Sequence, residues 1–184
     1  MSDTPTADDG PVAMMDYFMQ LDYHELLCPV VRRFSSQLLE GRLVGHKCPS
    51  CGLVYVPPRG YCPICVVPTT DADEVVLSDR GTVTNYTVVT PVQYYGQQET
   101  EPFVHASVLL DGADTPLNGM DIVGIPHDQL RMGLRVKAIW KPEGERTAQG
   151  ISNRGWGGLG SVVSAFEPTG EPDATDDVYR EHIF

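Results

Sequence analysis

Apolar residues recur at helical spacing near the start of the chain. Over residues 13–27 they share one face of a helix at positions i, i+4 and i+7, which are Met14, Phe18 and Leu21. We predict a helix there and a second one over about residues 30–40, with an apolar side formed by Val31, Phe34, Leu38 and Leu39. Cys28-Pro29 separates the two, because proline disfavours a helical conformation in the residue before it.

From residue 42 onward the pattern becomes that of short strands. Four apolar runs are separated by turn signals such as Asp111-Gly112 and Asn118-Gly119. The runs are Gly81–Val92, Phe103–Leu110, Met120–Ile125 and Leu134–Trp140. A short helical turn is expected over residues 127–132, and residues 161–166 are a candidate for one more edge strand. Strands this short, with one small helix between the later ones, predict a mainly β chain with a five-stranded barrel of the OB type.

Composition narrows the class of protein. The 184 residues are 41% hydrophobic, so a buried core is expected. The formal net charge is −12, which repels phosphate backbones and anionic membranes and counts against nucleic acid as the main partner. No apolar run approaches the roughly 20 residues that span a bilayer, and the N-terminus lacks a signal-peptide pattern. We therefore expect a cytoplasmic protein with neither a membrane nor a nucleic-acid partner.

The basic residues are unevenly distributed. Residues 41–70 carry Arg42, Lys47 and Arg59 and no carboxylate, and residues 131–154 carry six basic residues. In the second segment Arg135 and Lys137 alternate with apolar residues, as on the solvated face of a strand. The alternative is a docking face for the acidic groups of CoA or of a partner, with these two residues as candidates for contact with CoA phosphates.

Four of the five cysteines form two tight pairs, Cys48-Pro-Ser-Cys51 and Cys62-Pro-Ile-Cys65. A C-x-x-C turn points two sulfurs at one ion, and two such knuckles complete a tetrahedral four-sulfur site, for which zinc is favoured over iron. Because all four positions are cysteine, none is open to water, and the zinc is expected to be structural. Two redox pairs, or four unrelated buried thiols, are the alternatives.

Cys28 and His46 lie outside the two cysteine pairs. Cys28 lies in a helical context and is expected to be a core thiol. His46, two residues before Cys48, could be proposed as a ligand, but the four sulfurs already fill the coordination sphere.

We find no catalytic constellation in the sequence. The motifs G-x-S-x-G, H-E-x-x-H and G-x-x-x-x-G-K-[ST] do not occur. His105, in a predicted strand, could face either the core or a cleft. The glycine-rich segment 155–160 is interpreted as a flexible connector, with a CoA-contacting role as the alternative. By itself the chain is not expected to be an enzyme.

The order of motifs along the chain is distinctive. It begins with two helices, Gly41-Arg-Leu-Val-Gly-His-Lys-Cys-Pro-Ser-Cys-Gly52 and Cys62-Pro-Ile-Cys65, and continues with Gly81-Thr-Val-Thr-Asn-Tyr-Thr-Val-Val89, Glu101-Pro-Phe-Val-His-Ala and Gly133-Leu-Arg-Val-Lys137. This order resembles that of the DUF35 family, and the resemblance covers about residues 34–141. It implies a rubredoxin-like zinc ribbon followed by an OB-fold.

The resemblance also implies a role. Members of this family look like accessory subunits of thiolase-like enzymes, including lipid-transfer-type homologues that act as aldolases in steroid side-chain breakdown. The first hypothesis is therefore a non-catalytic subunit of a hetero-oligomeric aldolase or thiolase complex, with a CoA thioester as a possible ligand. The second is a stand-alone module that binds acyl-CoA, and the third is an OB-fold that binds nucleic acid.

These considerations divide the chain into five segments. We expect a disordered acidic tail over 1–12, N-terminal helices over 13–41, a zinc ribbon over 42–70 and an OB-fold over 71–142. Residues 143–184 are expected to form a C-terminal extension that docks on the partner.

Overall fold

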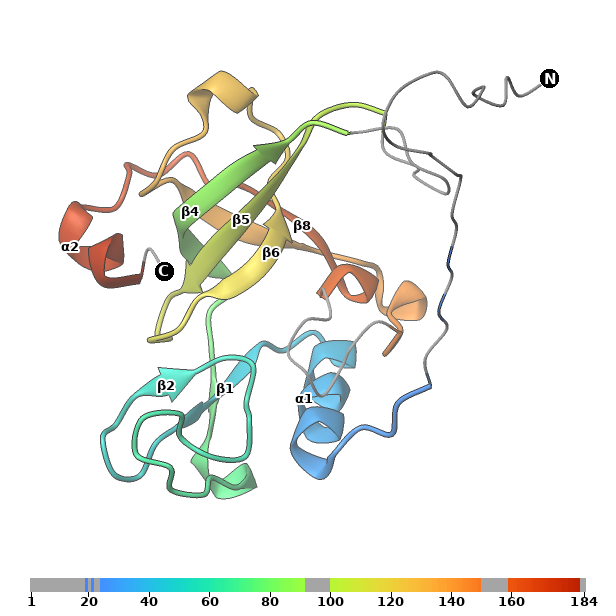
Figure 1. Cartoon of the computed structure of the whole chain (residues 1–184), viewed down its shortest axis with the longest axis vertical. Helices are drawn as coiled ribbons and strands as arrows, with labels where there is room; N and C mark the ends of the chain where they lie inside the picture. Colours follow the sequence, from blue (N-terminus) through green and yellow to red (C-terminus); the bar gives the residue numbers. More distant parts are fainter. Residues whose placement is uncertain (1–18, 20, 22–23, 92–99, 150–158, 183–184) are drawn as a thin grey trace, which may run out of the picture.

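The computed structural model describes residues 19, 21, 24–91, 100–149 and 159–182. Two sheets form two lobes, with a helix beside the smaller one (Figure 1). In the view of Figure 1 the five-stranded lobe lies above and the three-stranded lobe with the ribbon lies below.

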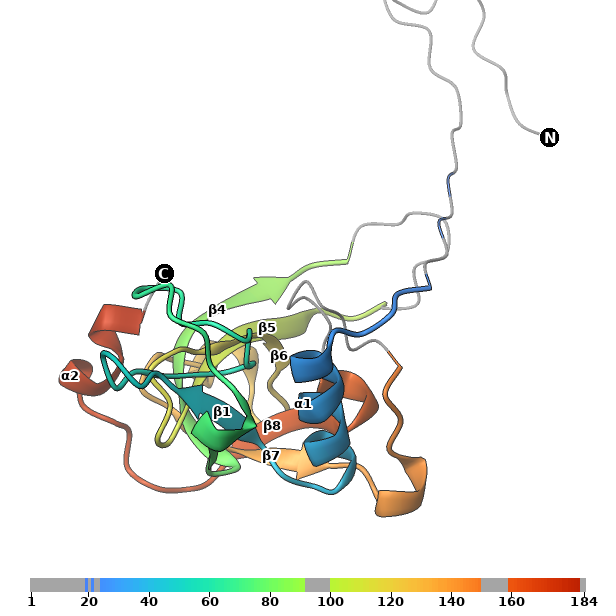
Figure 2. The same ribbon diagram turned by 90° about the horizontal axis from the view of Figure 1, so that it is seen from below.

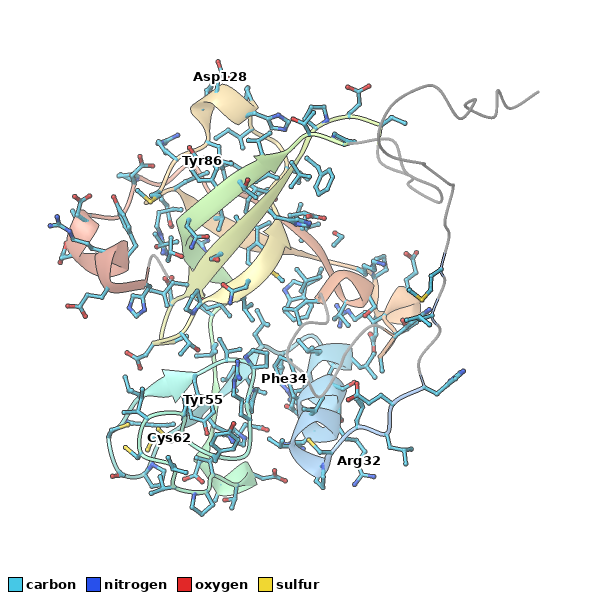
Figure 3. The ribbon with its side chains drawn as sticks, viewed as in Figure 1. Arg32, Phe34, Tyr55, Cys62, Tyr86 and Asp128 are labelled. Atoms are coloured by element: carbon cyan, nitrogen blue, oxygen red, sulfur yellow. The ribbon has the colours of Figure 1, made fainter. Side chains whose placement is uncertain are left out.

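Helix α1 spans Pro29–Leu39, which confirms the second predicted helix. Proline at the first helical position suits the start of a helix, because no intrahelical partner is lost there. The apolar side of α1 is buried, and Figure 3 shows Phe34 pointing from it toward the junction of the two lobes. Gly41, with φ of +79°, follows the end of the helix as expected.

The helix predicted over residues 13–27 falls largely outside the described residues. Where the structure does describe it, at residues 19, 21 and 24–27, no helix is present, and the prediction is wrong there. The side chains of Leu21 and Leu26 are 61% and 96% exposed. An isolated helix of about 15 residues is only marginally stable in water, so the apolar spacing alone does not ensure that a helix forms.

The smaller sheet belongs to the ribbon. Its central strand β1 (Val44–Lys47) pairs antiparallel with β2 (Val54–Tyr55) on one side and with β3 (Glu74–Val76) on the other. A capped turn of 3-10 helix, η1 (Asp71–Asp73), leads into β3. The sheet of the ribbon thus continues past residue 70.

The larger sheet is the barrel, with strand order β6-β5-β4-β7-β8. Its strands are β4 (Arg80–Val89), β5 (Phe103–Leu110), β6 (Leu117–Asp121), β7 (Arg135–Trp140) and β8 (Val163–Pro168). A parallel bridge between Ile122 and Phe166 joins the chain after β6 to β8 and closes the sheet. The Val123 N–H also donates to the Phe166 carbonyl over 2.9 Å. The mainly β fold with an OB barrel is confirmed, and its fifth strand comes from the C-terminal part of the chain.

The prediction of a turn at Asn118-Gly119 is wrong. Both residues lie inside β6, where the register with β5 shifts between Ala106 and Val108. Gly119 adopts φ of +72°, and the Ser107 hydroxyl donates to the Asn118 side chain over 2.7 Å. A glycine with positive φ and an irregular register are the marks of a bulge, so the same dipeptide that commonly makes a turn here bends a strand.

Short helical elements complete the described chain. They are η2 (His127–Gln129), η3 (Glu143–Glu145), η4 (Leu159–Ser161), α2 (Asp176–Tyr179) and η5 (Arg180–His182). The predicted helical turn over residues 127–132 is confirmed at its first three residues. None of the helices in the described part of the chain has the length and apolarity needed to cross a bilayer.

One apolar core joins α1, the ribbon sheet and the barrel. Phe34 and Leu38 of α1 and Val54 of the ribbon belong to the same buried cluster as the inward-facing residues of β4 to β8. Arg146 reinforces the junction, since it donates to the carbonyls of Lys141 and Leu39. Figure 1 and Figure 2 both show α1 close to β1 of the ribbon sheet.

Candidate metal centre and surface sites

The two cysteine pairs converge at the tip of the ribbon. The sulfur atoms of Cys48, Cys51, Cys62 and Cys65 all lie within 4.8 Å of one another. Both knuckles have the same local geometry, because the N–H of Cys51 approaches the Cys48 sulfur at 3.4 Å and the N–H of Cys65 approaches the Cys62 sulfur at 3.4 Å. Figure 3 shows Cys62 and Tyr55 within this lobe.

Each knuckle also closes on itself through backbone hydrogen bonds. The N–H of Gly52 donates to the Cys48 carbonyl over 3.0 Å, and the N–H of Val66 donates to the Cys62 carbonyl over 2.9 Å. The two loops are therefore equivalent turns in which Gly52 and Val66 hold the same position.

Four thiols at these distances do not ionise independently. Burial raises the pKa of Cys48, but the N–H groups of Cys51 and Ser50 and the neighbouring thiols outweigh burial and lower it to about 6. For Cys51 the N–H of Leu53 lowers the pKa, whereas burial and the neighbouring sulfurs raise it to about 12. Like charges this close oppose one another, so a cation is needed to hold all four as thiolates.

The residues present fit a zinc ion. With Zn–S bonds of about 2.3 Å, a tetrahedral site places its sulfurs about 3.8 Å apart. The Cys51 and Cys62 sulfurs, one from each knuckle, are 3.7 Å apart. Backbone N–H groups directed at the sulfurs are the outer-shell hydrogen bonds expected around metal-bound thiolates. The four cysteines are thus able to hold zinc in a closed site.

His46 lies outside this cluster. Its ring is buried, hydrogen-bonded through Nδ1 to the Thr69 hydroxyl at 3.0 Å, and in edge contact with the ring of Tyr55. The Tyr55 hydroxyl meets the same Thr69 oxygen at 2.7 Å. Burial lowers the pKa of His46, although nearby carboxylates oppose it. These contacts give His46 a supporting place beneath the knuckles.

The barrel supports the first knuckle directly. Asp114, in the loop between β5 and β6, accepts the Val54 N–H at 2.7 Å and donates its own N–H to the Val54 carbonyl at 2.6 Å. Thr115 next to it accepts the Val56 N–H at 2.9 Å and donates to the Val56 carbonyl at 3.2 Å. Strand β2 is therefore held by the barrel at the point where it leaves the first knuckle.

A cavity of about 320 Å³ lies where the ribbon meets the barrel. Its walls include Val56, Pro57 and Pro63 from the ribbon and Leu117 and Met120 from the barrel, and polar groups at its walls come from Arg59, Asn85, Asn118 and His182. This volume is at the lower end of that of small-molecule pockets.

The two candidates for phosphate contact lie on β7 in ion pairs. Arg135 binds both oxygens of Asp111, at 2.7 and 2.6 Å, and approaches Glu171 at 3.5 Å. Hydrogen bonding to Asp111 raises the pKa of Arg135. Lys137 pairs with Glu167 at 3.1 Å, and both side chains are nearly half-exposed. Contact with CoA phosphates stays a prediction, and for Arg135 it would require exchange of these carboxylates.

The other residues singled out in the sequence are His105, Cys28 and the glycine-rich segment 155–160. The His105 side chain faces outward, stacks edge-on against Phe103 and lies 3.1 Å from Asp121. Cys28 is exposed at the start of α1, so the prediction of a core thiol is wrong, because the residue precedes the buried face of the helix instead of joining it. Residues 155–158 of the glycine-rich segment lie outside the described residues, and Leu159 beyond them is buried in the core.

Comparison with known proteins agrees with this architecture. Residues 35–67 match the rubredoxin-like zinc ribbon domain of ChsH2, and residues 74–141 match the C-terminal OB-fold domain of ChsH2. A DUF35 domain-containing scaffold protein of Methanocaldococcus jannaschii is 30% identical over 116 residues, which cover 62% of this chain and 78% of that protein.

Two solved structures share the fold. A chain of the Ltp2-ChsH2(DUF35) aldolase superposes with a TM-score of 0.54 at 23% identity, over 79% of this chain and 98% of that chain. A DUF35 protein of unknown function from Sulfolobus solfataricus superposes with a TM-score of 0.52 at 20% identity, over 76% of this chain and 85% of its own. With the ribbon, the barrel and their order in agreement, the chain belongs to the DUF35 family.

Proposed function

We propose that this chain is a non-catalytic accessory subunit of a larger enzyme. It binds a thiolase-fold partner of the lipid-transfer-protein type and supports the partner's acyl-CoA chemistry. The observation that carries the proposal is the shared two-domain architecture, which extends over 98% of the chain named as part of the Ltp2-ChsH2(DUF35) aldolase. The relative from Methanocaldococcus jannaschii, described as a scaffold protein, supports the same class of role.

The reaction that we assign to the complex is a retro-aldol or thiolytic step in the degradation of a steroid or lipid side chain. In this proposal the partner's side chains perform the chemistry, and the CoA thioester binds mainly to the partner. The assembly is a hetero-oligomer, built on the partner's own dimer, and it acts in the cytoplasm.

The zinc in this proposal is structural. When bound by Cys48, Cys51, Cys62 and Cys65, it would offset half of the charge of the four thiolates and join the two knuckles without an open coordination position. The contribution of this chain is then a rigid surface, because the ribbon and the barrel share one core and are linked through Asp114 and Arg146.

The second hypothesis, a stand-alone module that binds acyl-CoA, has less support than the first. The cavity at the ribbon–barrel junction, about 320 Å³, is too small to enclose a whole acyl-CoA and would hold at most part of one. Binding of nucleic acid is disfavoured by the net charge of −12.

Co-expression with the cognate thiolase-fold protein tests the proposal. The two chains should co-purify as a stable complex, and the partner's turnover of its acyl-CoA substrate should fall sharply when this chain is left out. The isolated chain should have no turnover on acyl-CoA esters. Robust catalysis by the isolated chain, or a partner equally stable and active alone, would contradict it.

The predicted contact with CoA phosphates is tested separately by Lys137→Met. Both Lys137 and its partner Glu167 are exposed, so loss of this ion pair should leave stability nearly unchanged. If the lysine meets a phosphate, the KM of the complex for acyl-CoA should rise while kcat stays the same. An unchanged KM would contradict the predicted contact between Lys137 and a CoA phosphate.

A further inference from the structure

Three buried polar side chains meet beside the four-sulfur cluster. His46 lies on β1, Tyr55 lies opposite it on β2, and Thr69 follows the second knuckle, just before η1. The three residues are 1%, 2% and 7% exposed. The Thr69 hydroxyl lies 2.7 Å from the Tyr55 hydroxyl and 3.0 Å from Nδ1 of His46. One hydroxyl thus bonds two buried polar groups, and we call the three residues the Thr69 network.

The network links the two knuckles without using the metal. A hydroxyl can serve both neighbours at once, because it has one donor and two acceptor sites. His46 precedes the first knuckle and Tyr55 follows it, so both belong to the strands that flank that loop. Thr69 lies after the second knuckle, and its N–H donates over 3.0 Å to the carbonyl of Gly60, which lies before that knuckle. The Thr69 side chain therefore connects the strands of the first knuckle to the point where the second one begins and ends.

The network also reaches the buried sulfur ligands. Tyr55 shares one buried cluster with Cys48 and Cys62, which come from different knuckles. Its hydroxyl is bonded to Thr69, so the position of the ring beside these cysteines depends on that bond. Groups around the ligands of a metal site orient those ligands and are needed for tight binding of the metal.

We propose that Thr69 is a positioning residue of the zinc site and acts through Tyr55 and His46. It holds the two knuckles at the spacing that a shared ion requires, so the four sulfurs are arranged before the metal binds. Preorganisation of this kind raises affinity, because less ordering remains to be done on binding. Zinc retention is a property of the isolated chain, so this role does not depend on a partner.

A buried threonine that only stabilised the fold would behave differently. Its substitution would lower the melting temperature without a selective effect on zinc. Thr84 provides the comparison, because it is fully buried in β4 of the barrel and its hydroxyl donates to the Ser107 carbonyl over 3.4 Å. A substitution at Thr84 should therefore affect stability alone.

The test measures the rate at which the zinc-loaded chain releases its metal to an excess of a colorimetric chelator. Thr69→Val keeps the shape of the side chain but removes the hydroxyl. Changes around metal ligands typically lower affinity by about 10- to 100-fold, and we expect the lower end, about tenfold faster release, because Thr69 acts through Tyr55. Thr69→Ser restores the hydroxyl and should release zinc at nearly the wild-type rate. Thr84→Val is the matched control and should leave the rate unchanged.

Tyr55→Phe checks the same bond from its other end. It keeps the ring and removes only the hydroxyl, so zinc should again leave faster than from the wild type. In Thr69→Val/Tyr55→Phe the second change removes a polar group that has already lost its partner. Because the two changes act on one hydrogen bond, the double variant should release zinc no faster than Thr69→Val.

Two results would overturn the inference. One is equal release rates for the wild type, Thr69→Val and Tyr55→Phe, and the other is the same acceleration in Thr84→Val as in Thr69→Val. If Thr69→Val does not fold, Tyr55→Phe decides by the same measurement.

Discussion

The two zinc knuckles are the same turn with two different exteriors. Their hydrogen bonds to sulfur and carbonyl oxygen match within 0.1 Å, as the pairs at 3.4 and 3.4 Å and at 3.0 and 2.9 Å indicate. Yet one ends in Ser50 and Gly52 and the other in Ile64 and Val66. The geometry of the four-sulfur site therefore does not determine which side chains face outward.

The knuckles also differ in how they are held. The first leads into β2, which Asp114 and Thr115 of the barrel support through four hydrogen bonds. The second is closed mainly by contacts within its own loop, such as the Thr69 N–H to the Gly60 carbonyl at 3.0 Å and the bridge between Tyr61 and Pro68. The first knuckle is thus tied to the barrel by hydrogen bonds, whereas the hydrogen bonds found at the second knuckle among the described residues lie within the ribbon.

Loss of one cysteine sulfur should have the largest effect on zinc content and folding. The effect should be the same for either knuckle. Cys48→Ser and Cys62→Ser each remove one ligand of a shared site, and structural zinc in small modules supplies about 10–16 kcal/mol of binding free energy. We expect about one zinc per chain in the wild type and a much lower content, with poor solubility, in both variants. Metal analysis by mass spectrometry checks this. A wild-type protein that is folded but metal-free would contradict the zinc assignment.

Asp114→Ala should break the support that distinguishes the first knuckle. It leaves the N–H of the buried residue Val54 without its acceptor, which costs about 1–3 kcal/mol. For a chain of this size, the melting temperature should fall by about 2–4 °C for each kcal/mol. Thermal unfolding measured by circular dichroism checks the prediction, and Asp128→Ala, an exposed carboxylate on η2, is the control. An equal melting temperature for both variants would mean that Asp114 does not stabilise the first knuckle.

Substitutions at the fifth position of each knuckle, Gly52→Val and Val66→Gly, should change the free energy of unfolding by different amounts. No atom lies within 4 Å of a Cβ added at Gly52, so Gly52→Val costs only the left-handed conformation, about 1–2 kcal/mol. Val66→Gly removes the same strain but loosens the unfolded chain, so its stability should change by less than about 1 kcal/mol. Urea unfolding of both variants is the measurement. A clear loss of stability in Val66→Gly would mean that the valine packs within the free chain.

Nucleic acid should bind neither knuckle, which is the smallest effect expected. Lys47 and Arg59 are few against a net charge of −12, so gel-shift titrations at near-physiological salt should give no specific complex with single-stranded DNA or RNA. A salt-sensitive complex with sub-micromolar affinity would instead assign the basic ribbon to nucleic acid.

Local patterns determined much of this protein from its sequence alone. The paired C-x-x-C spacing predicted the four-sulfur cluster because each pair needs only a single turn to bring its sulfurs together. The apolar spacing of residues 30–40 predicted α1, and the run from Phe103 to Leu110 predicted β5 with the observed bounds. In each case the signal and the structure lie within one stretch of a few residues.

Only the tertiary structure decided what depends on distant partners. The bulge at Gly119 follows from pairing with β5, and the burial of His46 follows from its contacts with Thr69 and Tyr55. Strand β8 closes the barrel through Phe166, more than 40 residues after its neighbour Ile122. The positive φ of Val66 could not be predicted from its residue type either, because a β-branched residue rarely adopts it, and it accompanies the hydrogen bond from the Val66 N–H to the Cys62 carbonyl.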